Sequence, residues 1–133
     1  MKFLSFRRSI HHPFFPGLAA APAADARGRA QALAGTFDEL ARAAARGVGA
    51  RRAVYALTSE GAPLSDGERD ELWRLFQVPV YALLMEHGGR LAGWECEAQN
   101  GLHIAHGGDE SACACGRPGA VLTFADRLAH AGD

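Results

Sequence analysis

The chain lacks the features that mark membrane, secreted and nucleic-acid-binding proteins. Its 133 residues hold no apolar run long enough to span a bilayer. The amino-terminal stretch is interrupted by Arg7 and Arg8, so it has no uninterrupted apolar segment of a secretory signal. Fourteen basic and fifteen acidic residues leave a net charge of −1, without the positive excess that phosphate groups require. We therefore expect a cytoplasmic protein with no nucleic-acid and no membrane partner.

Motifs that carry chemistry are equally scarce. No glycine-rich phosphate loop of the usual pattern is present, no internal repeat is visible, and Ser59 has no evident base. The three cysteines are an odd number, which fits a reducing compartment where clustered thiols bind metal more often than they pair. The apolar share of 48% and the charged share of 22% are those of an ordinary globular domain.

What the chain does have is a cluster of soft metal ligands. All three cysteines and one histidine fall between residues 95 and 117, at Cys96, His103, Cys113 and Cys115. Three thiolates and one imidazole complete a tetrahedral zinc site and leave no open position for water. The pattern predicts a structural Zn²⁺ site, which stabilises the fold and does not activate a substrate.

Two alternatives to this ligand set remain open. His106 could replace His103 as the nitrogen ligand, and iron is a second metal for sulfur-rich ligation. A free cysteine is also often a small buried hydrophobe, or a redox-active thiol, so the cluster need not bind metal.

Residues 1–24 form a proline- and alanine-rich stretch that also carries four phenylalanines. Proline lacks the amide donor, so we expect neither a helix nor a central strand here. The stretch is predicted to be an arm that lies over its own domain or docks on a partner. Residues 25–133 are predicted to form one α/β domain with the zinc element at about 95–117.

Local signals predict the elements of that domain. Residues 25–46 are alanine-rich and predict two helices broken near Gly35, the second with a capping box at Thr36 and Glu39 and a stop at Gly47. Apolar runs at 53–57 and 78–84 predict buried strands, and a capping box at Ser65 starts a helix between them.

Strand, helix and strand with short loops predict a βαβ unit with parallel strands. Residues 86–90 predict a hairpin turn, followed by a returning strand over 91–96 and a third apolar segment at 102–104. Residues 120–124 predict a last strand, although Thr123 could instead cap a terminal helix. The fold predicted is therefore α/β: a small βαβ-containing sheet flanked by helices, with a zinc-stapled β-hairpin subdomain.

Other polar residues are weaker candidates for a site. His11 and His12 are expected to be solvated, since they lie in the predicted arm. Glu95 and Glu97 flank Cys96 and resemble an acid–base pair, but surface carboxylates are the usual explanation of such a pattern.

Residues 36–122 resemble an internal piece of phenylacetate–CoA ligase-like enzymes, a branch of the adenylate-forming ligases. The similarity is carried by residues 58–64, 76–81, 95–96, 101–103 and 113–117. The resemblance implies a ligase scaffold with a cysteine and histidine zinc element. It also implies that catalysis is lost. After the corresponding tyrosine the family has a glycine, a threonine and a magnesium-binding glutamate, whereas in this chain Ala82-Leu83-Leu84 follow Tyr81.

Three functions follow from these expectations. The first is a non-catalytic, zinc-stabilised protein-interaction module or small accessory subunit that resembles a truncated ligase. The alternative is a component of a split adenylate-forming ligase that binds nucleotide or acyl substrate together with another chain. A redox sensor built on Cys113 and Cys115 ranks last, because cysteines one residue apart form strained disulfides.

Overall fold

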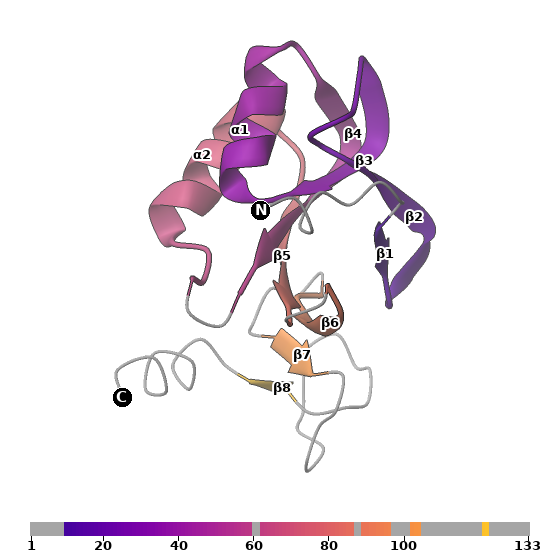
Figure 1. The fold of residues 1–133 in the computed structure, drawn as a ribbon, viewed down its shortest axis with the longest axis vertical. Helices are drawn as coiled ribbons and strands as arrows, with labels where there is room; N and C mark the ends of the chain where they lie inside the picture. Colours follow the sequence, from indigo (N-terminus) through magenta and orange to yellow (C-terminus); the bar gives the residue numbers. More distant parts are fainter. Residues whose placement is uncertain (1–9, 60–61, 87–88, 97–101, 105–120, 123–133) are drawn as a thin grey trace.

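The computed structural model describes residues 10–59, 62–86, 89–96, 102–104 and 121–122, and strands from these ranges form one mixed sheet (Figure 1). The strands lie side by side in chain order: β1 (Ile10–His12), β2 (Phe15–Pro22), β3 (Arg29–Gly35), β4 (Gly49–Thr58), β5 (Val80–Met85), β6 (Leu91–Trp94), β7 (Leu102–Ile104) and β8 (Val121–Leu122). The helices of the described part are α1 (Phe37–Ala45) and α2 (Asp66–Phe76).

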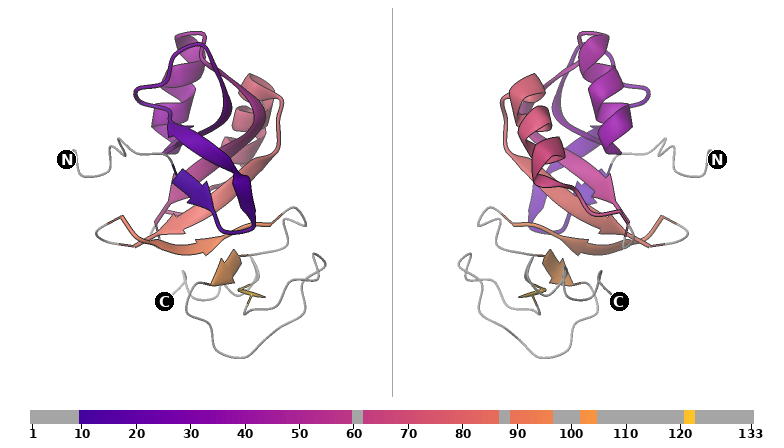
Figure 2. Two further views of the ribbon diagram at one scale, coloured as in Figure 1. Left: turned by 90° about the vertical axis from the view of Figure 1, so that its right-hand side faces the viewer. Right: turned by 90° about the vertical axis from the view of Figure 1, so that its left-hand side faces the viewer.

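The sheet is parallel in its middle and antiparallel at both ends. Strands β2, β3, β4 and β5 run parallel to one another, whereas β1 pairs antiparallel with β2, and β6, β7 and β8 continue the sheet from β5 in antiparallel pairs. The helices α1 and α2 pack against each other on one face of the sheet (Figure 2). The other face is concave, because the sheet curls into a half-barrel and brings the β1–β2 hairpin toward β6 and β7.

This architecture corrects the predicted fold class. The protein is not a small helix-flanked α/β sheet, because a strongly curled mixed sheet dominates it and both helices of the described ranges lie on the same face. The zinc-stapled hairpin subdomain is not separate either, since β6 and β7 continue the same sheet. The physical reason is that a curled sheet can bury its second face against its own outer strands and needs no second helical layer.

The two helix starts are confirmed. Thr36 and Ser65 each accept a hydrogen bond from the backbone amide three residues later, and Glu39 and Glu68 each bond back to the cap amide. Both capping boxes therefore satisfy amides that would otherwise have no partner in the first turn. Helix α1 ends at the expected place, where Gly47 takes a positive φ of 87°.

The predicted βαβ unit is also confirmed. Strands β4 and β5 pair in parallel with Val54 opposite Val80 and Leu57 opposite Leu83, and α2 connects them. Strands β5 and β6 pair antiparallel, as expected, and the amide of Glu86 donates to the carbonyl of Arg90.

The prediction of a first helix in residues 25–46 is wrong. Residues Arg29–Gly35 form β3, which lies between β2 and β4. Alanine favours helices in isolation, but Ala32 and Ala34 face the concave side of the sheet, where only small side chains fit beneath the aromatic rings. Tertiary packing therefore overrides the local preference.

The expectation that residues 1–24 contain no central strand is also wrong, because Phe15–Pro22 form β2. Strand β2 lies inside the sheet, between β1 and β3. Its prolines do not prevent this, because Pro13 lies in the turn after β1, Pro16 is only the second residue of β2 and Pro22 is its last residue. Residues 1–9 lie outside the described part.

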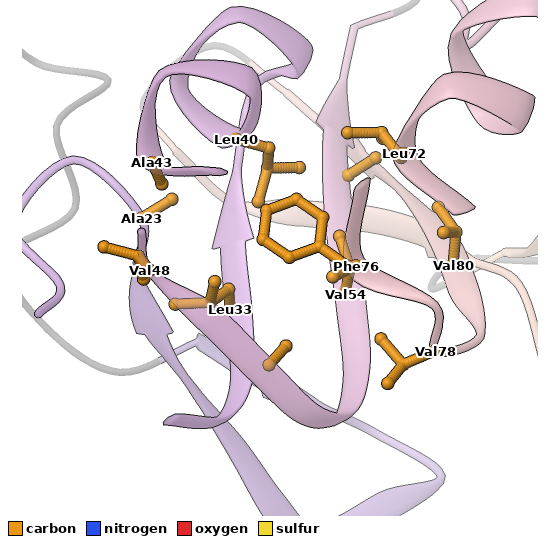
Figure 3. Packing of buried hydrophobic residues seen from close by; sticks show 12 residues of the cluster. Ala23, Leu33, Leu40, Ala43, Val48, Val54, Leu72, Phe76, Val78 and Val80 are labelled. Carbon is orange, nitrogen blue, oxygen red and sulfur yellow. The ribbon is translucent and has the colours of Figure 1, made fainter. Parts of the chain in front are cut away.

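The main aliphatic core lies between the helices and the sheet (Figure 3). Leu40 from α1 and Leu72 from α2 are fully buried against Leu33 of β3 and Val54 of β4. Phe76 closes the layer at the end of α2. This core holds the helical face in place and leaves the concave face to be organised by other contacts.

Truncation of Leu72 tests this packing. Leu72→Ala is expected to lower the free energy of unfolding by about 2–5 kcal/mol, because it removes buried methyl groups and leaves a cavity. Asp70→Ala on the exposed side of the same helix is the control and should change stability by less than about 0.5 kcal/mol. Urea unfolding followed by circular dichroism measures both, and equal midpoints for the two variants would contradict the described core.

Candidate functional site

The predicted zinc ligands are only partly covered by the structure. Cys96 follows β6 and His103 lies on β7, and both side chains are buried. Cys113, Cys115 and the alternative ligand His106 lie outside the described residues.

Within the described ranges, no group of three or more histidine, cysteine, aspartate or glutamate side chains is placed to hold a metal ion. This finding overturns the prediction of a zinc cofactor and the description of the protein as zinc-stapled. Two contacts of His103 are with aromatic rings. Its ring meets Phe14 edge-on at 4.6 Å and lies parallel to Trp94 at 6.4 Å between centroids, as in ordinary aromatic packing.

Glu95 forms a network of hydrogen bonds that the sequence did not predict. Glu95 was expected at the surface but its side chain has no solvent exposure. Its two carboxylate oxygens accept a two-pronged ion pair from Arg69 of α2, with both N–O distances at 3.0 Å. The amide of Ala82 donates to the same carboxylate at 2.6 Å. Burial removes water from the carboxylate of Glu95. The two bonds from Arg69 and the bond from Ala82 replace the lost hydration, so the ion pair has a fixed geometry.

His12 extends this network to the first strand of the sheet. It was expected to be solvated, yet it is 1% exposed. Its Nε2 donates to the carbonyl of Glu95 at 2.5 Å, and the amide of Phe14 donates to its Nδ1 at 3.0 Å. The ring also stacks on Phe15 at 4.0 Å. The neutral imidazole with its proton on Nε2 satisfies both contacts, so His12 connects the hairpin to the end of β6.

The phenol of Tyr55 makes a further connection across the concave face. Tyr55 Oη donates to the carbonyl of Leu18 at 2.8 Å, and the side chain has no solvent exposure. Burial, reinforced by the neighbouring Tyr81, raises the pKa of Tyr55 to about 12, and the positive charge of Arg52 acts in the opposite sense. This hydrogen bond joins β4 to β2, although β3 lies between these two strands in the sheet.

A hollow of about 340 Å³ opens beside this bond. It is lined by Phe15, Gly17 and Leu18 of β2, by Arg52 and Ala53 of β4, and by Tyr81 of β5. The small residues Gly17 and Ala53 leave the space, and the aromatic rings and Leu18 wall it. We call this feature the concave hollow. Its volume is at the small end of the range for ligand pockets.

Four arginines lie near the starts of the parallel strands β3 and β4, and one of them, Arg52, lines the concave hollow. Arg27 precedes β3, Arg29 is the first residue of β3, and Arg51 and Arg52 follow the start of β4. The amide of Gly49 donates to the carbonyl of Gly28 at 2.9 Å, which brings the two groups together. All four are exposed, and no described carboxylate lies within salt-bridge distance of them. We call this group the arginine edge.

Sequence reasoning missed the arginine edge because the overall charge of −1 hides it. The signal was available: residues 27–52 contain six arginines and two acidic residues, while the rest of the chain is acidic. The concave hollow had no such signal, since it depends on β2, β4 and β5 meeting on one face of the sheet.

Comparison with known proteins adds no relative. No family model and no curated protein matches the chain. The resemblance to phenylacetate–CoA ligase-like enzymes therefore has no support from these comparisons, and ATP-dependent acyl activation is not part of the function proposed below. The helices in the described part of the chain are too short or too polar to cross a membrane.

Neutralising Glu95 tests the buried ion pair. Glu95→Gln is expected to lower the free energy of unfolding by about 3 kcal/mol, because Arg69 is left without its counter-charge. Glu71→Gln breaks the exposed ion pair with Arg74 and should leave the melting temperature unchanged within error. Thermal melts of both variants measure the difference, and a Glu95→Gln protein as stable as the parent would contradict the structural role of the pair.

Alkaline titration tests the burial of Tyr55. Because the pKa of Tyr55 is raised above the value of about 10 for an unfolded tyrosine, its share of stability is complete below pH 10 and is lost as the pH rises toward 12. Tyr55→Phe should remove the phenolate absorbance that appears near pH 12 and flatten the loss of stability in this range. If the variant keeps the same high-pH absorbance step, Tyr55 is not the buried phenol.

Proposed function

We propose that this chain is a non-catalytic protein-interaction module or small accessory subunit that works in the cytoplasm. Its partner on this proposal is another protein, with neither nucleic acid nor membrane involved. The observation that carries the proposal is the concave hollow with the arginine edge near it: a recess lined in part by Phe15, Leu18 and Tyr81, next to exposed arginines at the starts of β3 and β4.

The use of the buried polar groups supports a non-catalytic role. Glu95 is occupied by Arg69, His12 by Glu95 and Phe14, and Thr58 donates to the carbonyl of Leu83 at 3.0 Å. A general acid or base must reach a substrate proton within hydrogen-bond distance. Among the described residues these groups instead hold strands and helices together.

The surface features are those of protein interfaces. Arginine and aromatic residues are the side chains that contribute most to protein–protein binding, usually around a recess that one partner side chain fills. The concave hollow offers such a recess, and Phe15, Leu18 and Tyr81 are part of its lining. On the opposite, helical side, Trp73 is 54% exposed and offers a second, isolated apolar contact.

Copurification tests this function. The full-length tagged chain, expressed at its natural level and recovered from native extract, is expected to elute in size-exclusion chromatography together with a partner protein. The reason is that a partner surface with complementary charge and an apolar side chain would pair with the exposed arginines and fill the recess. These contacts lower the free energy of the complex. A clean monomer at physiological protein levels would contradict the proposal.

A further inference from the structure

The charges of this protein are strongly separated along the chain. Six of its fourteen basic residues are arginines between residues 27 and 52, and thirteen of its fifteen acidic residues lie elsewhere. The two acidic residues of this stretch, Asp38 and Glu39, lie in the first turn of α1, at the far end of that helix from Arg46. The stretch from residue 27 to residue 52 is therefore positive, although the whole chain is slightly negative.

The register of the sheet places the starts of β3 and β4 level with the part of β2 that lines the concave hollow. Ala21 of β2 pairs with Leu33 of β3, and Arg29 of β3 pairs with Gly49 of β4. Leu18, which lines the hollow, therefore lies at the level of the first residues of β3 and β4. Arg52 belongs to both features, because it lines the hollow and its charge acts on the phenol of Tyr55.

The shape of the concave hollow favours one apolar side chain as its occupant. It is open to solvent on one side, so it would not enclose a whole small ligand as a typical ligand cavity does. Its volume and its walls of Phe15, Leu18 and Tyr81 fit a single anchoring side chain of a partner. The surrounding arginines would then contact neighbouring residues of the same partner.

The aromatic rings make a nucleic acid the less suitable partner. Single-stranded nucleic acids need exposed ring faces on which bases can stack. The ring of Phe15 already stacks on His12 at 4.0 Å, and Tyr81 is only 9% exposed. The acidic remainder of the chain would also repel a polyanion that extends beyond the arginine edge.

We infer that the arginine edge and the concave hollow together bind an acidic protein segment that inserts one apolar side chain. The inference rests on the proposed function and specifies its surface and its partner. Carboxylates pair with the planar guanidinium groups of Arg51 and Arg52, and the apolar side chain of the segment fills the concave hollow over Phe15, Leu18 and Tyr81.

The probe is a short synthetic peptide with glutamates on both sides of one phenylalanine, labelled for fluorescence polarisation against the full-length chain. We expect binding that weakens with salt, and that weakens about tenfold when alanine replaces the phenylalanine or glutamine replaces the glutamates. In the labelled protein, amide NMR signals of Gly17, Leu18 and Ala53 should shift and those of α2 should not. Absence of binding at about 1 mM peptide would overturn the inference.

Charge reversal provides the matched variants. Arg51→Glu with Arg52→Glu should weaken peptide binding at least about tenfold, since like charges would then face each other. Arg74→Glu makes the same kind of charge reversal on helix α2 and should leave the affinity within about twofold. Thermal melts confirm that each variant is folded. Equal affinity of the parent and the Arg51, Arg52 variant would place the peptide elsewhere and refute the inference.

Two further outcomes separate this inference from the proposed function. If Trp73→Ala disrupts the native complex while the Arg51, Arg52 variant preserves it, the partner docks on the helical face; the inference is then wrong and the proposed function stands. If a single-stranded oligonucleotide binds more tightly than the peptide and competes with it, the surface recognises nucleic acid and the inference is again wrong. A monomer without a partner in native extract contradicts the proposed function whatever the peptide does.

Discussion

The curl of the sheet depends on the hydrogen bonds and the ion pair of one buried residue, Glu95. It is buried between α2 and β5, and it ties Arg69 of the helical layer to the amide of Ala82. The backbone of the same residue accepts from His12, which belongs to the first strand. One residue therefore joins the helical layer, the middle of the sheet and its amino-terminal edge. A buried charge is costly without these partners, so the three segments are held in one arrangement.

The two faces of the sheet are stabilised by different means. The helical face buries aliphatic side chains such as Leu40 and Leu72, whose contribution depends on area and close packing. The concave face combines alanines with aromatic rings, and it is joined by the bonds of His12 and Tyr55. Because alanine is small, the concave face is incompletely filled, and the concave hollow results. The proposed binding surface is thus a consequence of how this face is built.

Elements defined by neighbouring residues could be predicted, and elements defined by distant contacts could not. The helices that begin after Thr36 and Ser65 could be predicted because a capping box needs only four consecutive residues. Strand β3 was mistaken for a helix because its alanines carry no strand signal until the aromatic rings above them are known. Glu95 was mistaken for a surface residue because its partner, Arg69, lies 26 positions earlier in the chain. The cysteine pattern suggested a metal that the described residues are not arranged to bind.

The sequence alone determined the two capped helices, the parallel pairing of β4 with β5 and the hairpin after it, since each follows from short-range hydrogen bonding and hydrophobic spacing. Only the tertiary structure decided that the sheet curls, that Glu95 and His12 are buried, and that Arg52 lies beside the concave hollow. These features need segments far apart in the chain to meet, and the free energy of that meeting comes from burial and charge pairing that no local pattern records.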